Sequence, residues 1–390
     1  MISRPFSRTV LILYVSIGQG HRRAALALRS ALVRIAPECR VVTIDIFRIY
    51  PSGLVSLLLG LYRAVVTLTP RCWNYLYDNA RVKERCSGTL EFLYRRGAPA
   101  MVSLFKQFSP AAVVCTQTIP CALSAHARRL TGSDYPRLVA VPTDYLVHRY
   151  WTFPEVDLYF APAAFSRRTL IERGVPARRI SVSGIPVDPD FSRPRRRSVL
   201  WAKYGLSPNT PRVLVMGGGG GARRTQGLIR SLDRLESPFQ IVVLAGRNLE
   251  LNRGLEKMRP RLRHPLRAFA YLESVDELME IADVIVTKPG GLTTSEALIK
   301  RVPMVLIDPL PGQEVLNSRL LEEHGAALRS EDGRSAAALV SLLLNGSPEK
   351  KRLLQAAGRL RRPRAALMAA RRIMELIDDQ ILPVQAAAQD

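Results

Sequence analysis

The feature that most constrains the fold is an alternation of short apolar runs with segments of helical periodicity. In segments such as 22–35 and 336–344, Leu and Ala recur every three or four positions, as in amphipathic helices. The apolar runs predict strands at 10–16, 41–46, 111–116, 138–142, 158–161, 180–182, 212–216, 240–245, 267–271, 284–287 and 304–307. Alternating strands and helices indicate βα units and parallel sheets, so we expect an α/β protein.

A stretch of proline and arginine divides this pattern. Residues 186–198 read PVDPDFSRPRRRS, which sustains neither a helix nor a central strand. Each side opens with a strand, a glycine-containing turn and a helix, which predicts two Rossmann-like domains that bind ligands at the carboxyl ends of their strands. The predicted parts are an N-terminal domain, a linker, a C-terminal domain and a helical tail that packs back towards the first domain, at 1–192, 193–198, 199–347 and 348–390.

The net charge is the outlier of the composition. Lys and Arg number 57 against 33 Asp and Glu, a formal charge of +24. Such a surplus predicts attraction to polyanions, namely nucleic acid, an anionic lipid surface or phosphorylated substrates. The five cysteines form no CxxC or CxxH pair, so they indicate neither a disulfide framework nor a zinc site and favour a reducing cytosol.

Two apolar segments could be read as a signal peptide or as a membrane-spanning helix. The N-terminal segment lacks a small-residue cleavage pattern and passes directly into a glycine turn and an amphipathic helix, so we interpret it as a buried strand. The second segment, 53–69, is interrupted by Arg63 and is shorter than the ~20 apolar residues of a spanning helix. We therefore expect that the chain does not cross a bilayer.

The first glycine turn combines a ligand-binding backbone with a titratable group. Gly18 and Gly20 let a ligand approach the main chain, and the helix that follows favours negative charge at its start. A dinucleotide fingerprint would need a third glycine at position 23, which is Arg. A histidine side chain ordinarily titrates near neutral pH, so His21 is a candidate base; the alternative is a capping or merely exposed histidine.

Three further turns follow predicted strands in the second half. The five glycines at 217–221 lack the GK[ST] of a nucleoside-triphosphate loop, so they indicate either a ligand held against the main chain or a flexible loop. The sequence KPGGLTTSEA at 288–297 is typical of a phosphate seat at a helix start, with a carboxylate one turn later for ribose hydroxyls. Amide and acid groups at 308–317 are candidates for sugar hydroxyls; the alternative is that these polar residues only form turns and caps.

Taken together, these motifs resemble those of the diacylglycerol glycosyltransferases. The set is GQGH at 18–21, TDYLVHRYW at 143–151, SGIPVDPDF at 183–191, the five glycines, KPGGLTTSEA, and PGQEVLN at 311–317. The family includes monogalactosyldiacylglycerol synthases and processive diacylglycerol glucosyltransferases, and it is similar to the enzyme that adds N-acetylglucosamine to lipid I. The resemblance covers roughly residues 10–330. It implies a GT-B fold with two domains facing across a cleft, a UDP-sugar donor, an inverting transfer, and no metal or other cofactor.

The resemblance also implies roles for individual residues. His21 would be the base, with Gly20, Asp144, His148 and Trp151 on the acceptor side. The diphosphate would lie on Gly218, Gly219, Gly290, Gly291, Leu292 and Thr293. Tyr271 and Leu272 would contact the uracil and Glu296 the ribose, and the donor sugar would face Gln313, Glu314 and Asn317.

The apolar segment 53–69 has two interpretations. Its large residues recur at helical spacing on one face, at Leu54, Leu57, Leu58, Leu61 and Val65, as in an ordinary buried helix or in an interfacial helix that enters a lipid surface. Basic residues near an anionic surface would strengthen docking. With the resemblance, this predicts a cytoplasmic protein peripherally bound to the inner face of the cell membrane.

The predicted function is transfer of a hexose from a UDP-sugar to the hydroxyl of diacylglycerol. A second hypothesis is transfer of N-acetylglucosamine from its UDP donor to a polyprenyl-linked acceptor. A third, from another class, is a basic nucleic-acid-binding protein. The sequence has no zinc finger, no RNA-recognition signature and no basic cluster beyond 195–197, so a nucleic-acid partner is not expected.

Overall fold

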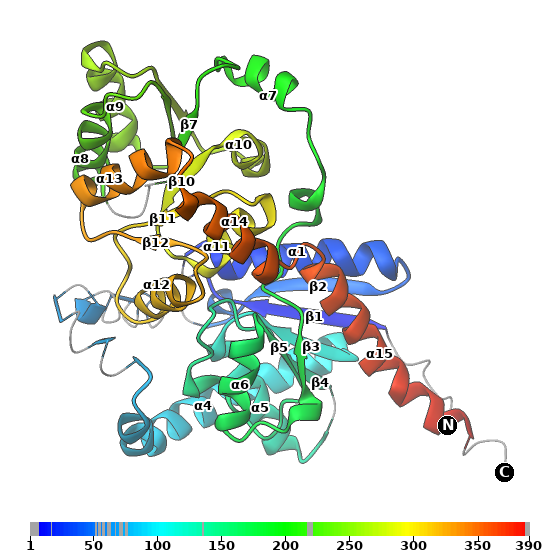
Figure 1. Cartoon of the computed structure of the whole chain (residues 1–390). Coiled ribbons are helices and arrows are strands. Elements are labelled where there is room, and N and C mark those ends of the chain that lie inside the picture. The colour runs from blue at the N-terminus through cyan, green and yellow to red at the C-terminus, as the bar shows by residue number, and fades with distance from the viewer. Residues whose placement is uncertain are drawn as a thin grey trace. The chain divides into compact units, whose positions relative to one another are not determined.

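The chain forms two compact units, each built on one parallel sheet. The computed structural model describes residues 8–16, 18–50, 53, 56, 59–60, 64–66, 68–69, 73–74, 77–134, 136–216 and 221–386. Unit 1 comprises Met1–Pro189, Pro311–Gln313 and Arg364–Asp390, and unit 2 comprises Asp190–Leu310 and Glu314–Pro363. Each unit contains a six-stranded sheet flanked by helices (Figure 1). The predicted α/β class is confirmed.

The sheet of unit 1 has the strand order β2-β1-β3-β4-β5-β6, and every neighbouring pair is parallel. Its strands are β1 (Thr9–Tyr14), β2 (Arg40–Asp45), β3 (Ala112–Cys115), β4 (Arg137–Ala140), β5 (Leu158–Ala161) and β6 (Ile180–Val182). From β1 the chain first adds a strand on one side and then crosses to the other side to add β3. Such a reversal opens a crevice at the carboxyl ends of β1 and β3, where open α/β sheets bind ligands.

Helices cover both faces of this sheet: α1 (Gly20–Ile35), α4 (Ala80–Phe108), α5 (Thr118–Thr131), α6 (Ala164–Glu172) and α15 (Ala365–Ala386). A hydrophobic cluster lies on each face of this sheet, and alternate residues of β1 pack into one or the other because successive side chains of a strand point to opposite faces. Val10 and Ile12 pack with residues of α1 and α15. Leu11 and Leu13 pack with residues of α4 and α5. All four are fully buried, which explains why β1 is continuously apolar.

Unit 2 repeats the plan with the order β12-β11-β10-β7-β8-β9, again all parallel. Its strands are β7 (Arg212–Met216), β8 (Gln240–Gly246), β9 (Leu266–Ala270), β10 (Val284–Thr287), β11 (Met304–Leu306) and β12 (Leu328–Arg329). Its helices are α7 (Arg197–Tyr204), α8 (Ala222–Asp233), α9 (Leu249–Met258), α10 (Val275–Ile281), α11 (Gly291–Lys300), α12 (Gln313–Glu323), α13 (Gly333–Leu344) and α14 (Pro348–Leu360). The order reverses between β7 and β10, so the crevice of this sheet lies at their carboxyl ends.

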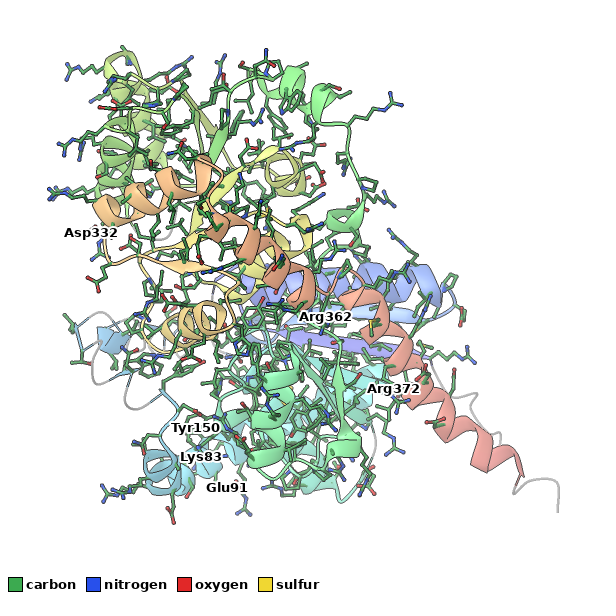
Figure 2. All side chains as sticks on the ribbon, viewed as in Figure 1. Lys83, Glu91, Tyr150, Asp332, Arg362 and Arg372 are labelled. Carbon is green, nitrogen blue, oxygen red and sulfur yellow. The ribbon has the colours of Figure 1, made fainter. Side chains whose placement is uncertain are left out.

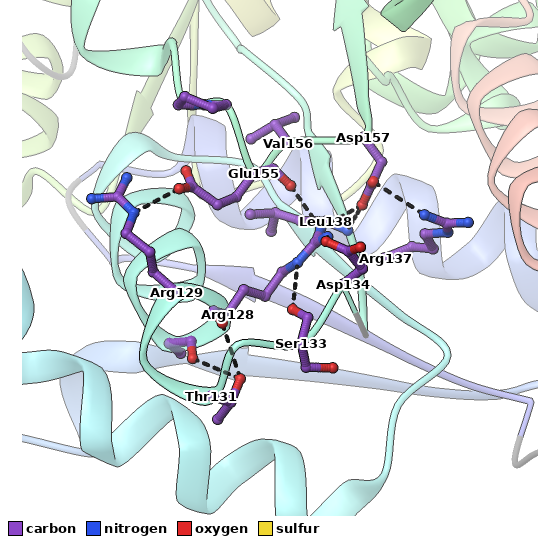
Figure 3. Close-up of polar contacts among 12 residues, drawn as sticks. Arg128, Arg129, Thr131, Ser133, Asp134, Arg137, Leu138, Glu155, Val156 and Asp157 are labelled. Carbon is purple, nitrogen blue, oxygen red and sulfur yellow. Dashed lines mark hydrogen bonds and ion pairs between the residues drawn. The ribbon is translucent and has the colours of Figure 1, made fainter.

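A buried polar network fixes α5 to the strands beneath it (Figure 3). The Arg128 guanidinium, only 5% exposed, donates to Asp157 and to the Glu155 carbonyl oxygen, both at 2.6 Å. Asp157 also accepts the backbone N–H of Leu138 at 2.8 Å. A charge in this position is stable only with such partners, so the network ties α5, β4 and the approach to β5 into one body.

No helix within the described residues is long and apolar enough to span a membrane. Of the face predicted in segment 53–69, Leu54, Leu57, Leu58 and Leu61 lie outside the described residues. Val65 is described, and its carbonyl oxygen accepts the backbone N–H of Thr69 at 3.0 Å.

Candidate functional site

His21 lies at the crevice of unit 1. It is the second residue of α1, directly after the turn that follows β1, and its Nδ1 lies 2.9 Å from the carbonyl oxygen of Thr116, directly after β3. The Thr143 hydroxyl oxygen lies 2.9 Å from the same nitrogen. In return, the Thr116 hydroxyl donates to the His21 carbonyl oxygen at 3.1 Å. These contacts join the ends of β1 and β3 at the point where the strand order reverses.

The contacts of His21 select one tautomer. A carbonyl oxygen only accepts hydrogen bonds, so Nδ1 carries the proton and the lone pair of the neutral ring lies on Nε2. Among the described residues, Nε2 has no hydrogen-bond partner. Although the residue is partly exposed, desolvation lowers the pKa of His21 to about 4, and the bond to Thr116 opposes that change only in part. The geometry therefore provides a neutral imidazole whose Nε2 can accept a proton.

His148 lies in the second motif, just before the short 3-10 helix at Arg149–Trp151. Its ring packs edge-on against Tyr77, with centroids 4.9 Å apart, and lies 6.3 Å from the Trp151 ring. Burial, followed by the nearby charges of Arg173 and His21, lowers the pKa of His148 to about 3, so this second histidine is also neutral. Trp151 itself belongs to the hydrophobic core of unit 1.

Asp78 fastens the second motif to the chain before α4. Its carboxylate accepts the Arg149 backbone N–H at 2.9 Å and pairs with the Arg173 guanidinium, which also donates to the Val147 carbonyl oxygen. Lys83 donates to the Arg149 carbonyl oxygen at 2.7 Å. Sequence reasoning missed these residues, because partners separated by up to 95 positions leave no pattern in the sequence.

The remaining acceptor-side residues lie beside these groups in the chain. Gly20 begins α1 immediately before His21, and the partly exposed Asp144 directly follows Thr143. The structure thus assembles His21, Thr116 and Thr143 by direct contact. It also places His148 so close to His21 that a positive charge on His21 lowers the pKa of His148.

In unit 2, the sequence KPGGLTTSEA forms the turn after β10 and the start of α11. Gly290 precedes the helix and Gly291 is its first residue. The Thr294 hydroxyl donates to the carbonyl oxygen of Gly290 at 2.9 Å. Because that hydroxyl is engaged, the donors available to an anion are the backbone N–H groups of the first turn, where the helix dipole is positive.

The first turns of α12, the helix after β11, meet this turn. The buried Asn317 side chain donates to the Pro289 carbonyl oxygen at 3.2 Å. Glu314 accepts the Leu310 backbone N–H at 2.7 Å. A Cβ built on Gly290 would lie 3.8 Å from Glu314, which places three predicted donor-site residues beside one another.

The other predicted donor-site residues differ in exposure. Glu296 and Leu292 are buried, Thr293, Leu272 and Gln313 are partly exposed, and Tyr271 is exposed with the Arg247 guanidinium 5.1 Å from its ring centroid. Gly218 and Gly219 lie outside the described residues. Because all strands are parallel, Tyr271 after β9, the turn after β10 and the loop after β11 share the carboxyl edge of the sheet.

A small pocket between the ends of β7, β10 and β11 carries Lys288, the first residue of the KPGGLTTSEA motif, and Arg224, which sequence reasoning missed. Arg224 and Lys288 line it, together with Met216, Thr225 and Asp308. Arg224 pairs with Asp308 at 3.4 Å, and its side chain is 70% exposed. The crevice edge of unit 2 therefore combines a helix start with two positive side chains, as suits an anionic ligand.

Two family models match the two halves of the chain. Residues 21–187 match monogalactosyldiacylglycerol (MGDG) synthase, and residues 212–376 match the glycosyltransferase family 28 C-terminal domain. Among curated relatives, the processive diacylglycerol beta-glucosyltransferase of Bacillus pumilus is 28% identical over 84% of this chain and 85% of its own length. That of Bacillus cytotoxicus is 29% identical over 94% of this chain and 92% of its own length.

Solved structures show the same fold at low identity. Acinetobacter baumannii MurG has a TM-score of 0.61 and 17% identity, covering 94% of this chain and 99% of its own. The UDP co-structure of S. aureus MnaA has a TM-score of 0.60 and 14% identity, covering 96% of each chain. The GT-B fold is confirmed. Since the two models match its two halves and the relatives span most of its length, this chain is similar over nearly its whole length to the diacylglycerol glycosyltransferases, with an N-terminal part like MGDG synthase and a C-terminal part like the family 28 C-terminal domain.

Proposed function

We propose that this glycolipid glycosyltransferase moves a hexose from a UDP-sugar to the hydroxyl of diacylglycerol and inverts the anomeric centre. The observation that carries the proposal is the placement of His21, whose Nδ1 is held by Thr116 and Thr143 and whose Nε2 is available. The curated relatives named for diacylglycerol glucosyl transfer support the acceptor and a hexose.

On the acceptor side, His21 Nε2 removes the proton from the lipid hydroxyl as its oxygen attacks the anomeric carbon. The new C–O bond forms on the face opposite the bond to UDP, which breaks and leaves its electron pair on the diphosphate. Attack from that face inverts the configuration. The Thr116 carbonyl oxygen, which accepts the Nδ1–H, stabilises the imidazolium that forms. His148, Asp144 and Gly20 border the acceptor.

On the donor side, the backbone N–H groups at Gly290 and Gly291, with Lys288 and Arg224, receive the negative charge that develops on UDP. In this proposal these groups fill the role that a metal ion has in other transferases. Glu296 binds the ribose, Tyr271 and Leu272 the uracil, and Gln313, Glu314 and Asn317 the sugar. The solved structure of one neighbour in fold, S. aureus MnaA, is a co-structure with UDP, which supports this donor class.

The test is a transfer assay on liposomes. Purified protein is mixed with phosphatidylglycerol vesicles that contain diacylglycerol and with one labelled donor at a time: UDP-glucose, UDP-galactose, UDP-glucuronic acid or UDP-N-acetylglucosamine. We expect label in a glycosyl-diacylglycerol, with an anomeric configuration opposite to that of the donor by NMR. Label that appears in parallel vesicles carrying a polyprenyl-linked acceptor, and none in diacylglycerol, would instead select the second hypothesis. Retained configuration would exclude the inverting mechanism.

The low pKa of His21 predicts an unusual pH dependence. A base must be unprotonated, so kcat/KM falls as the pH drops through the pKa of this residue in the free enzyme. With that pKa at about 4, we expect the contribution of His21 to be flat between pH 5 and 8 and the acid limb to lie near pH 4. Initial rates after brief exposure to each pH, with recovery checked at pH 7, measure the profile. An acid limb near pH 6.5 would contradict the desolvated base.

Thr143 is expected to act as a positioning residue for His21. Thr143→Val removes the hydroxyl that lies 2.9 Å from Nδ1, and the loss of one such contact lowers kcat about fivefold with KM nearly unchanged. Thr143→Ser keeps the hydroxyl and should restore kcat. Steady-state kinetics of both variants check this. Equal losses of kcat in the Val and Ser variants would assign the effect to packing instead.

A further inference from the structure

One ion pair holds the main chain on both sides of His148. The Asp78 carboxylate accepts the backbone N–H of Arg149, the next residue after His148, at 2.9 Å. It also pairs with the guanidinium of Arg173, which donates to the carbonyl oxygen of Val147, the residue before His148. The Arg173 side chain is only 8% exposed. Because a buried guanidinium is stable only with its partners, this pair fixes the main chain at that point.

The position of the His148 ring depends on that main chain. Its Nδ1 is buried, and among the described residues this nitrogen has no hydrogen-bond partner. The ring centroids of Tyr77, Tyr150 and Trp151 lie 4.9, 5.8 and 6.3 Å from that of His148. Aromatic pairs accept both stacked and edge-on arrangements, so these contacts alone do not fix the imidazole. Loss of the hold on the main chain would therefore let the ring move.

The start of α4 supports this hold. Asn79 directly follows Asp78 and caps the helix, since its side-chain oxygen accepts two backbone N–H groups of the first turn, at 3.0 and 3.3 Å. Lys83, in the same turn, donates to the Arg149 carbonyl oxygen at 2.7 Å. Figure 2 labels Lys83 and Tyr150 beside each other, and the ammonium group lies 6.0 Å from the ring centroid. A capped helix start therefore carries two of the side chains that hold the motif.

We propose that Asp78 and Arg173 are positioning residues for acceptor binding, because their ion pair keeps His148 where the lipid substrate binds. The inference rests on the proposed function, in which His148 borders the acceptor. Both residues act through the main chain beside His148, so loss of the pair should weaken acceptor binding more than it slows the chemical step. Donor binding should change little, because the groups proposed to bind the uracil, ribose and diphosphate belong to unit 2.

The test compares two matched variants of the full chain. Asp78→Ala removes the ion pair beside His148. Asp283→Ala makes the same change in unit 2, where Asp283 accepts the Arg212 backbone N–H at 2.8 Å and pairs with its guanidinium, which is 7% exposed. Transfer is measured in neutral detergent micelles while the mole fraction of diacylglycerol and the concentration of the UDP-sugar are varied in turn. Circular dichroism confirms that both variants keep the fold.

We expect Asp78→Ala to raise KM for diacylglycerol about tenfold, with kcat and the KM for the UDP-sugar within about threefold of wild type. Asp283→Ala should leave the KM for diacylglycerol unchanged. Asp78→Asn keeps an oxygen for the Arg149 N–H, so it should restore part of the affinity for diacylglycerol, and it replaces the Ala variant if that one does not fold. An unchanged KM for diacylglycerol overturns the proposal. So does an equal rise of both KM values, which a merely structural loss would produce.

A second measurement separates this inference from the proposed function, because it needs no transfer. Diethyl pyrocarbonate modifies accessible neutral imidazoles, and peptide mass spectrometry follows each histidine. His148 is 9% exposed, so it should react slowly in wild type and in Asp283→Ala and several-fold faster in Asp78→Ala, with the buried His264 as the internal reference. Unchanged reactivity of His148 overturns the inference. If wild type labels no diacylglycerol but His148 becomes reactive only in Asp78→Ala, the proposed function fails while the hold of this ion pair on His148 stands.

Discussion

Replacing His21 by Ala is expected to lower the rate of glycosyl transfer by about 10²–10⁴-fold, the range that a positioned general base contributes. The reason is that Nε2 of this residue is the group we assign to remove the acceptor proton, and its lone pair is directed by the bond from Nδ1 to the Thr116 carbonyl oxygen. UDP binding should change little, because the groups proposed to bind the uracil, ribose and diphosphate belong to unit 2. Single-turnover transfer rates and calorimetric titration with UDP measure the two quantities separately.

His21→Asn is the informative control for this prediction. The Asn side chain can place an amide N–H near the position of Nδ1 and keep the bond to Thr116, but it has no basic nitrogen at the position of Nε2. A structural role would therefore be largely rescued by Asn, whereas a base would not. We expect both variants to be similarly slow. A His21→Asn enzyme with more than about a tenth of the wild-type rate would remove His21 from the role of base.

Local patterns predicted the strands well because each one is short, apolar and bounded by turn residues. A strand is present at every predicted position, from β1, whose residues are buried on both faces, to β9, whose burial is only partial. The exception is β12, whose two residues pair with two residues of β11 at the edge of the sheet and are too few to show a periodicity.

The site was predicted only where its residues belong to one continuous motif. The glycine turn predicted His21 as a site residue, but its partners Thr116 and Thr143 lie 95 and 122 positions away in the chain. They meet because β1 pairs with β3 and β3 pairs with β4, and that adjacency is a property of sheet topology rather than of local sequence. Thr143 belongs to the TDYLVHRYW motif, so its hydroxyl was the one feature of the sequence that could have indicated a partner for His21. No sequence motif indicated Asp78 or Arg173.

The second large effect concerns stability, through the buried network on α5. Asp157→Ala removes a carboxylate that accepts from Arg128 at 2.6 Å, from the Leu138 backbone N–H at 2.8 Å and from Arg137 at 3.3 Å. The Arg128 side chain is only 5% exposed, so it is left as a buried cation with one fewer partner. Breaking such a pair lowers the free energy of unfolding by about 3–5 kcal/mol. The transition of unit 1 in scanning calorimetry should fall by roughly 10 °C.

A matched control uses the same arginine. Asp134 also pairs with Arg128, at 3.3 Å, but its side chain is fully exposed. Water already screens that contact, so Asp134→Ala should shift the transition far less than Asp157→Ala does. Equal shifts would mean that the loss reflects the number of ion pairs and not the burial of the charge.

The double variant Arg128→Ala with Asp157→Ala distinguishes an unpaired charge from lost packing. If the penalty of Asp157→Ala arises because a buried guanidinium lacks its counter-charge, removing that guanidinium as well should add little, and the double variant should be more stable than the sum of the two single effects predicts. If each side chain instead contributes by filling space, the two losses should add. The double variant should still unfold below wild type, because it loses the contacts of Asp157 with the Leu138 N–H and Arg137 and those of Arg128 with the Ser133 and Glu155 carbonyl oxygens and with Asp134.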